Sequence, residues 1–209
     1  MLHNLISLIA PRKCALCGQV SEDICAECRS ALHPATLRID HLPLVVAVHE
    51  KHFVQVVVMW KDQRTKSLTP IIAELLAQAL PSNATGALVP IPSRKSSQVT
   101  RGWNPLLALA AEVAKRSDLQ LEPDVLSWGS EPREQRNLND AERHANVASR
   151  LHCGSIPAQP IWLLDDVMTT GATLRAAAQS LQQRGGVIAG AMVVAAPRRS
   201  HSLVTEVHN

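Results

Sequence analysis

Aromatic side chains are scarce in this chain of 209 residues, which contains four Trp, one Phe and no Tyr. Proteins that bind single-stranded nucleic acid without sequence preference stack the bases on aromatic rings. Such a platform is poorly supplied here, so any contact with nucleic acid would be made mainly to the phosphate backbone. The formal net charge of +3 permits this contact without requiring it, because a small basic excess usually belongs to a solvated surface.

Long apolar runs are also missing. No segment reaches the roughly 18 consecutive apolar residues that a membrane span needs, so we expect no membrane span. The N-terminal segment 1–10 is apolar, but its nearest positive charges, Arg12 and Lys13, follow the apolar part. This order does not fit a secretory signal peptide. A short amphipathic helix fits the segment better, and we expect a cytoplasmic protein.

The most informative stretch runs from Ile161 to Leu174 and reads IWLLDDVMTTGATL. Its continuous apolar run predicts a buried strand of a parallel sheet, which stops at Asp165 and Asp166. A loop rich in Thr and Gly follows, and then a helical pattern. The apolar face of this predicted helix contains Leu174, Ala177, Ala178 and Leu181.

This order places hydroxyl and backbone N–H groups at the start of a helix, where the helix dipole favours a phosphate. The two carboxylates suit ribose hydroxyls, from which they accept hydrogen bonds, or a hard cation such as Mg²⁺. An ordinary turn between strand and helix is the alternative. Two adjacent carboxylates at the end of a buried strand are, however, unfavourable without a ligand.

The stretch resembles the signature with which type I phosphoribosyltransferases bind phosphoribosyl pyrophosphate (PRPP). The resemblance implies that Asp165 and Asp166 contact the 2′- and 3′-hydroxyls of the ribose, and that the loop holds the 5-phosphate. It also implies that Mg²⁺ accompanies PRPP. The candidate PRPP-binding residues in this stretch are Asp165, Asp166, Val167, Met168, Thr169, Thr170, Gly171, Ala172 and Thr173.

Four cysteines near the N-terminus form two C-x2-C pairs separated by seven residues: Cys14, Cys17, Cys25 and Cys28. Two residues between thiolates allow both sulfurs to bind one Zn²⁺ at the ~2.3 Å of a Zn–S bond. Disulfides are disfavoured in a reducing cytosol, and a redox pair would not need a second C-x2-C. We therefore expect a structural zinc site with no open position for catalysis. Cys153 is expected to be an incidental thiol of a loop.

A four-cysteine finger before a PRPP signature resembles the ComF (GntX-like) family, and the likeness covers most of the chain. It includes a segment centred on Lys61, which the resemblance implies is helical at its Lys61 end although its valines favour a strand. It also includes the box Arg101-Gly102-Trp103-Asn104-Pro105 and a second box with Gln135, Leu138, Glu142, Arg143 and Asn146. Pro105 and Pro132 depart from the usual Gln and Thr.

The basic residues are candidates for contacts with phosphate. By the resemblance, Arg101 and Lys61 meet the pyrophosphate of PRPP, whereas Arg94 and Lys95 could equally belong to a solvated loop. The segment from Glu131 to Arg150 could form a hood over the site, a surface helix with paired charges, or a face for DNA. The candidate DNA or phosphate contacts are Arg133, Arg136 and Arg143.

The predicted fold class is α/β, with a parallel sheet flanked by helices and its ligand at the carboxyl ends of the strands. Apolar patterns predict strands at 44–48, 87–92 and 187–196, and a helix at 106–113. Another helix is predicted to begin with Thr69 as its N-cap and Pro70 at its first position. We expect an N-terminal helix and finger at 1–40, a phosphoribosyltransferase-like domain at 41–200 and a loose tail at 201–209.

For function, the sequence predicts binding of PRPP or a related ribose phosphate. The ComF resemblance implies a role in DNA uptake or utilisation, with single-stranded DNA and the competence machinery as partners. An active phosphoribosyltransferase with an unknown acceptor and a PRPP-sensing regulator are the alternatives. No acceptor pocket and no general base can be identified from the sequence.

Overall fold

The computed structural model describes residues 13–14, 16–21, 23–49, 53–63, 65–92, 102–129 and 151–196. Its central sheet has six strands in the order β1-β2-β8-β7-β3-β4. The strands are β1 (Ala35–Ile39), β2 (Leu42–His49), β3 (Thr85–Pro90), β4 (Asp118–Leu121), β7 (Ile161–Val167) and β8 (Ile188–Ala196). Only the β1–β2 pair within this sheet is antiparallel. The predicted α/β fold class is confirmed.

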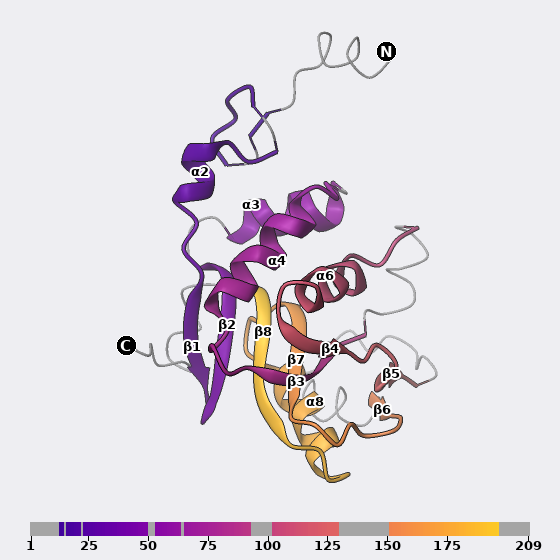
Figure 1. Cartoon of the computed structure of the whole chain (residues 1–209). Coiled ribbons are helices and arrows are strands. Elements are labelled where there is room, and N and C mark those ends of the chain that lie inside the picture. The colour runs from indigo at the N-terminus through magenta and orange to yellow at the C-terminus, as the bar shows by residue number, and fades with distance from the viewer. Residues whose placement is uncertain are drawn as a thin grey trace.

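Helices cover both faces of the sheet (Figure 1). One face packs against α3 (Phe53–Val57), η2 (Val58–Asp62), α4 (Leu68–Ala79) and α6 (Pro105–Ala114). The other packs against α8 (Ala172–Gln182) and a small sheet of β5 (Leu126–Trp128) and β6 (Leu151–Cys153). A short helix α2 (Ala26–Ser30) belongs to the cysteine-rich segment. No helix among the described residues is long and apolar enough to cross a membrane.

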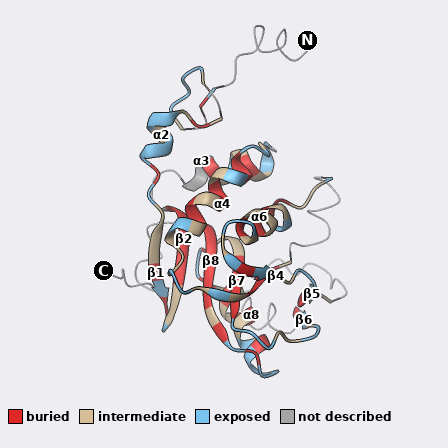
Figure 2. Cartoon of the chain, in the orientation of Figure 1, coloured by how far each residue is buried: buried red, intermediate tan, exposed pale blue. Residues whose placement is uncertain are grey.

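The central strands are apolar because helices cover both of their faces. In β7 the first four residues are at most 3% exposed, and β8 is buried along nearly all of its length. Figure 2 shows this buried band running through the middle of the sheet. Successive residues of a strand point to opposite faces of the sheet. Leu164 therefore belongs to the hydrophobic core on the side of α4 and α6, and Leu163 to the core on the side of α8.

Two predictions for the segment before β3 had different outcomes. The Lys61 end is helical, as the resemblance implied, and it forms the π-helix η2. The N-cap prediction is wrong, because α4 begins at Leu68 and Ser67 precedes it. The hydroxyl of Thr69 is engaged elsewhere: it accepts a hydrogen bond of 3.0 Å from Nε1 of the fully buried Trp60.

The connections of β3 and β7 diverge at the carboxyl ends of these strands. These strands are parallel neighbours, and the α6 connection leads from β3 outward to β4. The α8 connection leads from β7 in the opposite direction to β8, across the other face of the sheet. Ligands of open α/β sheets bind outside the carboxyl ends of the strands where such connections diverge. The residues at these ends are Pro90 to Pro92 and Asp165 to Val167.

Candidate functional site

The acidic pair lies at the carboxyl end of β7, beside β3. The strand includes both carboxylates and continues to Val167, so it ends slightly later than the apolar run alone indicated. Both aspartates are partly buried. Oδ1 of Asp165 accepts a hydrogen bond of 2.8 Å from the backbone N–H of Asp166. This contact fixes the position of one carboxylate relative to the strand end.

Lys61 connects the helical layer to the acidic pair. Its ammonium group, carried by η2, donates to Oδ2 of Asp166 and forms an ion pair across 105 positions of the sequence. The Lys61 and Asp166 side chains are only 18% and 22% exposed, so water screens the pair weakly. The structure thus places Lys61 beside the carboxyl end of β7, where it is paired with the Asp166 carboxylate.

The two aspartates differ in their electrostatic surroundings. Burial, and after it the neighbouring Asp166 carboxylate, raises the pKa of Asp165 to about 7. The hydrogen bond from the Asp166 backbone and the charge of Lys61 act against this rise. Near neutral pH Asp165 therefore exchanges between a form that only accepts hydrogen bonds and one that also donates. A pair of hydroxyls could hydrogen-bond to either form.

The loop after β7 brings the remaining signature residues together. Met168 is buried and its N–H donates to the carbonyl of Ala195, which fixes the beginning of the loop. Thr169 and Thr170 are exposed, and Ala172 and Thr173 form the first turn of α8. The helix starts as predicted, with N–H groups and hydroxyls at its N-terminus, the environment that phosphate groups occupy in many proteins.

Gly171 is the N-cap of α8 and has a left-handed backbone with φ of 74°. A side chain would be strained in this conformation. A Cβ atom at this position would also lie 2.6 Å from Cδ1 of Ile39 on the neighbouring hairpin. The left-handed conformation thus requires glycine here, and the Ile39 side chain would have to shift to admit any Cβ atom.

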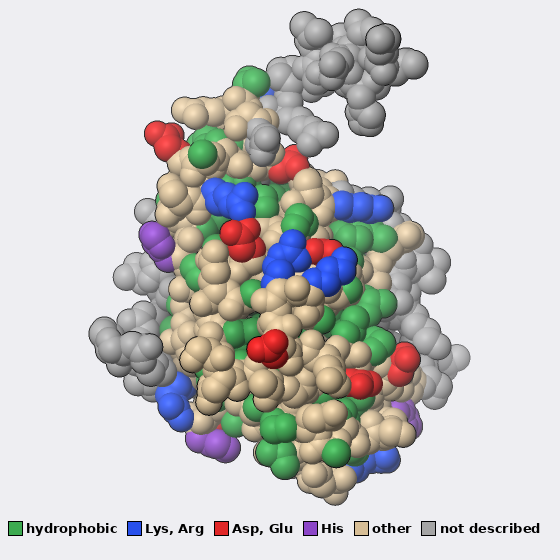
Figure 3. Space-filling view, in the orientation of Figure 1, with side chains coloured by type: hydrophobic (Ala, Val, Ile, Leu, Met, Phe, Trp, Pro, Cys, Tyr) green, Lys and Arg blue, Asp and Glu red, His purple; other side chains and the backbone are tan. Residues whose placement is uncertain are grey.

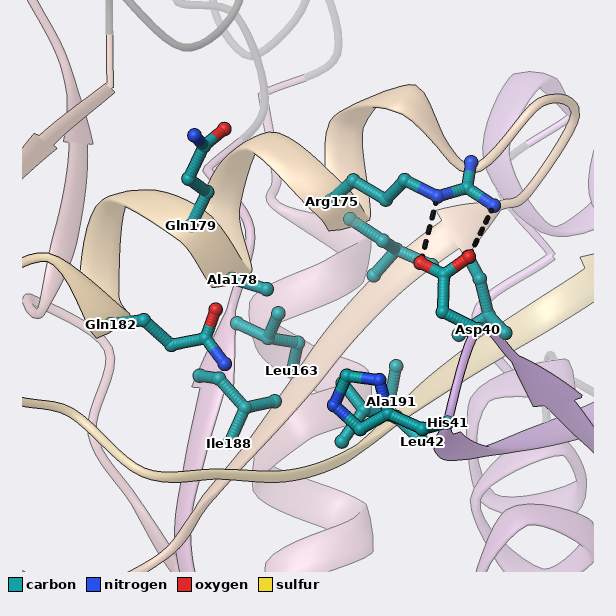
Figure 4. A pocket seen from close by; sticks show the side chains of 12 residues that line it. Asp40, His41, Leu42, Leu163, Arg175, Ala178, Gln179, Gln182, Ile188 and Ala191 are labelled. Carbon is teal, nitrogen blue, oxygen red and sulfur yellow. Dashed lines mark hydrogen bonds and ion pairs between the residues drawn. The ribbon is translucent and has the colours of Figure 1, made fainter.

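Two residues beside this loop were missed by the sequence analysis. Arg175 of α8 donates from Nη1 to the carbonyl of Thr170 at 2.7 Å. The same guanidinium forks onto Asp40 in the β1–β2 turn, with N–O distances of 3.0 and 3.3 Å (Figure 4). A cavity of about 210 Å³ lies between this turn and α8. The sequence feature that could have identified Arg175 is its position near a helix N-terminus. The helix dipole disfavours a positive charge there unless the charge is paired.

The four cysteines of the two C-x2-C pairs lie together, and their sulfurs all lie within 4.8 Å of one another. The Sγ atoms of Cys17 and Cys25 are 3.7 Å apart, close to the ~3.8 Å edge of a tetrahedron with Zn–S bonds of ~2.3 Å. Sγ of Cys14 accepts from the N–H groups of Leu16 and Cys25. Such bonds stabilise thiolates, so this donor set fits Zn²⁺.

The thiols of the cluster have unequal pKa values. For Cys14, burial raises the pKa, but hydrogen bonds from backbone N–H groups outweigh burial and lower it to about 6. The hydrogen bond with Cys25 is the largest cause that raises the pKa of Cys28. The Cys14 thiolate is therefore stabilised before metal binds, whereas Cys28 would lose its proton when the cation binds.

The finger packs against the same core as the helical layer. Cys14, Ile24 and Leu32 are buried in the cluster that contains Trp60 of η2. At the surface, Arg29 of α2 forms an ion pair with Glu74 of α4. Cys153 lies at the end of β6, outside the cysteine cluster. The prediction that Cys153 lies in a loop is wrong, because it is the last residue of this short strand.

Several candidate residues lie outside the described part of the chain. They are Arg94, Lys95, Arg101, Arg133, Arg136 and Arg143, with the second ComF-like box, segment 1–10 and the tail at 201–209. Of the first box, Asn104 caps α6 by accepting from the N–H of Leu107 at 3.1 Å, and Pro105 begins the helix. Proline fits this position because its missing N–H would have no partner within the helix.

The chain is similar in sequence to known phosphoribosyltransferases. No family model matches the sequence. The chain is 34% identical over 131 residues to an adenine phosphoribosyltransferase of Clavibacter michiganensis subsp. michiganensis (strain NCPPB 382), covering 62% of this chain and 71% of the relative. The chain belongs to the type I phosphoribosyltransferase family.

Two further matches are more partial. An adenine phosphoribosyltransferase of Clavibacter sepedonicus is 34% identical over 62% of this chain, and the match spans 65% of that relative. A hypoxanthine phosphoribosyltransferase structure from Staphylococcus aureus matches with 14% identity and a TM-score of 0.36, over 63% of each chain. These matches therefore span somewhat less than two thirds of the similar proteins.

Proposed function

We propose that this member of the family binds PRPP, or a related ribose phosphate, at the carboxyl ends of β3 and β7. One observation carries the proposal. A partly buried acidic pair and the N-terminus of α8 lie on either side of a short Thr- and Gly-containing loop, where the connections of the sheet diverge. Asp165 and Asp166 then accept hydrogen bonds from the ribose hydroxyls, and residues 169–173 surround the 5-phosphate.

Lys61 has a specific part in the proposed binding. When Asp166 turns to the ribose, its ion pair with Lys61 must lengthen or rearrange, and the ammonium group becomes available for the anionic pyrophosphate. Arg101, which lies between β3 and α6 in the sequence, is proposed as a second contact with the pyrophosphate. The Mg²⁺ that accompanies PRPP would neutralise part of its charge.

Calorimetry with Mg²⁺-PRPP tests the proposal. Wild type is expected to bind, and the variant with both Asp165→Asn and Asp166→Asn is expected to bind at least about tenfold more weakly, because it loses charge-assisted hydrogen bonds to the diol. Asp118→Asn, which changes an exposed aspartate at the start of β4, is the control. Equal affinity of wild type and the double variant would contradict the assigned site.

Turnover of PRPP is the enzymatic extension of this proposal. The relatives named above are transferases, and in such a reaction pyrophosphate leaves C1 of the ribose while a nucleophile attacks an oxocarbenium-like centre. Basic groups would stabilise the departing charge. Labelled PRPP with a panel of nucleobases separates the possibilities: base-dependent release of pyrophosphate supports an enzyme, and binding without release supports a sensor or adaptor.

A role in DNA uptake or utilisation is the finer part of the proposal and rests on the ComF resemblance. The described surface adds little to it, because three of its exposed cations, Arg29, Lys115 and Arg116, are paired with Glu74 or Glu112. Figure 3 shows Lys and Arg side chains beside Asp and Glu side chains on the visible face. The proposed DNA contacts are therefore those of the segment 131–150.

A binding assay with single-stranded DNA at increasing salt tests this role. Backbone contacts predict an affinity that falls steeply with salt, and Arg143→Ala is expected to reduce both the affinity and the slope. Lys115→Ala, which changes an exposed cation already paired with Glu112, is the control. An absence of salt-sensitive binding would rule out direct DNA contact.

The division into finger, transferase-like domain and tail at residues 40 and 200 is part of the same proposal.

A further inference from the structure

We propose that Arg175 is a positioning residue that holds the phosphate-binding loop in its binding conformation, with Asp40 as its anchor. The inference rests on the proposed function, because it concerns the loop assigned to the 5-phosphate. Arg175 lies in the first turns of α8, yet it contacts the loop before the helix and a hairpin 135 positions away in the sequence.

The contact with the loop determines the direction of one peptide group. Nη1 of Arg175 donates to the carbonyl oxygen of Thr170 at 2.7 Å. The peptide bond from Thr170 to Gly171 is trans, like every described peptide bond, so its C=O and N–H point in opposite directions. By holding the carbonyl, Arg175 directs the N–H of Gly171 to the opposite side of the loop. The proposal assigns this N–H to the phosphate.

The conformation of Gly171 makes such a restraint necessary. Its left-handed backbone, with φ of 74°, is accessible to glycine among many other conformations. A glycine without restraint would lose much conformational entropy when a ligand ordered the loop. The Arg175 contact reduces this loss by ordering the peptide group before the ligand arrives. Preorganisation of this kind increases affinity without adding a contact to the ligand.

Asp40 holds the other side of the guanidinium. Its two carboxylate oxygens accept from Nε and Nη2 at 3.0 and 3.3 Å, which leaves Nη1 directed at the loop (Figure 4). Asp40 has a positive φ of 56° in the β1–β2 turn, a conformation that aspartate tolerates better than most residues. The adjacent Ile39 approaches Gly171 from the same hairpin. The hairpin thus supports the loop by packing and through Arg175.

Lysine could not replace this arrangement. A guanidinium presents several N–H groups in one plane and can contact Asp40 and Thr170 at once, whereas an ammonium group is a point charge on a flexible chain. The Asp40 pair also compensates a cation near the positive end of a helix dipole. These three hydrogen bonds therefore specify arginine at this position.

Hydrogen exchange of backbone amides in the free protein tests the restraint without any ligand. Arg175→Ala is expected to increase exchange at residues 169–173 by about tenfold, because the loop loses a charge-assisted hydrogen bond. Exchange in β8 is expected to remain unchanged. Asp40→Asn provides a second variant that acts from the hairpin, and it should produce a smaller increase at the same amides. Arg175→Lys should resemble Arg175→Ala.

Arg184→Ala is the matched control, because Arg184, which lies just after α8, likewise donates from Nη1 to a backbone carbonyl, that of Cys153, at 2.8 Å. It should leave the loop unaffected. Unchanged loop exchange in Arg175→Ala would overturn the proposal. An equal increase in the loop and in β8 would overturn it too, since Arg175 would then support only the general stability of the fold.

Binding of ribose 5-phosphate is measured on the same proteins. Arg175→Ala should bind about tenfold more weakly than wild type, and Arg184→Ala should bind like wild type. If wild type binds neither ribose 5-phosphate nor Mg²⁺-PRPP, the proposed function fails, while the exchange data still decide whether Arg175 orders the loop. If wild type and Arg175→Ala bind equally, the positioning role is refuted and the proposed function stands.

Discussion

The cysteine cluster and the acidic site after β7 are assembled in different ways. In the cluster, all four sulfurs come from a short stretch of chain, and the contact from Cys25 to Cys14 spans only 11 positions. At the acidic site, Lys61 contacts Asp166 across 105 positions, and the loop beside it is held by Arg175, which contacts Asp40 across 135 positions. The cluster therefore needs mainly its own segment and a metal ion, whereas the acidic site and its loop need the sheet and the helices on both of its faces.

The largest expected effect concerns the cluster. Purified protein should contain one zinc ion per chain, and Cys25→Ser should remove it and lower the melting temperature markedly. Structural zinc contributes an apparent ~10–16 kcal/mol to the folding of small domains. Serine can still cap α2 as Cys25 does, so loss of the cap is minimised. Metal analysis and thermal melting measure both effects.

Cys153→Ser is the control, because Cys153 lies outside the cluster. It should retain zinc and melt close to wild type. If wild-type protein contains no metal and a chelator leaves its melting temperature unchanged, the zinc site is refuted.

The second effect concerns the helical layer between the two regions. Thr69→Val removes the acceptor of the buried Trp60 indole N–H and should destabilise the protein by ~1–3 kcal/mol. Thr69→Ser keeps an acceptor and should cost less. Denaturant unfolding gives both free energies. Equal stability of Thr69→Val and wild type would show that this bond does not support the layer that contains Lys61.

The third effect is a pH dependence caused by Asp165. The pKa of this carboxyl rises from 3.8 to about 7 on folding, so the folded protein binds more protons between these values. Stability from this group is greatest below pH 4 and decreases as pH rises to about 7. Asp165→Asn should therefore exceed wild type in stability by a few kcal/mol at pH 8 and lose this advantage near pH 4.

Denaturant unfolding at the two pH values measures this difference, with Asp118→Asn, a change at an exposed aspartate of β4, as the control. A stability difference between wild type and Asp165→Asn that does not change with pH would contradict the assigned environment of Asp165.

The smallest effect concerns the surface link between finger and domain. Arg29 and Glu74 are 48% and 43% exposed, so water and salt screen their ion pair. A double-mutant cycle with Arg29→Ala and Glu74→Ala should give a coupling below ~1 kcal/mol. The same cycle on Lys61 and Asp166, which are more buried, should give a larger coupling. Equal couplings would remove the distinction between these two pairs.

This contrast explains what the sequence could reveal. The finger and the β7–α8 signature were predicted because their spacing and apolar pattern are local. Strand β1 was missed because it has only five residues. Its two buried side chains, Leu37 and Ile39, alternate with polar ones over too short a stretch to form a clear pattern. Thr69 was wrongly predicted to be an N-cap. Its actual role, accepting a hydrogen bond from Trp60, arises from tertiary packing and has no local sequence pattern. The contacts Lys61–Asp166 and Asp40–Arg175 have no local pattern, because the sheet brings these residues together.

The most direct test of the account is a crystal structure of the protein with ribose 5-phosphate. We predict that the phosphate lies at the N–H groups of residues 169–173, that the 2′- and 3′-hydroxyls contact Asp165 and Asp166, and that Lys61 has moved from its position on Asp166. A ligand bound elsewhere, with the Lys61–Asp166 pair intact and the loop at 169–173 unoccupied, would contradict the central claim.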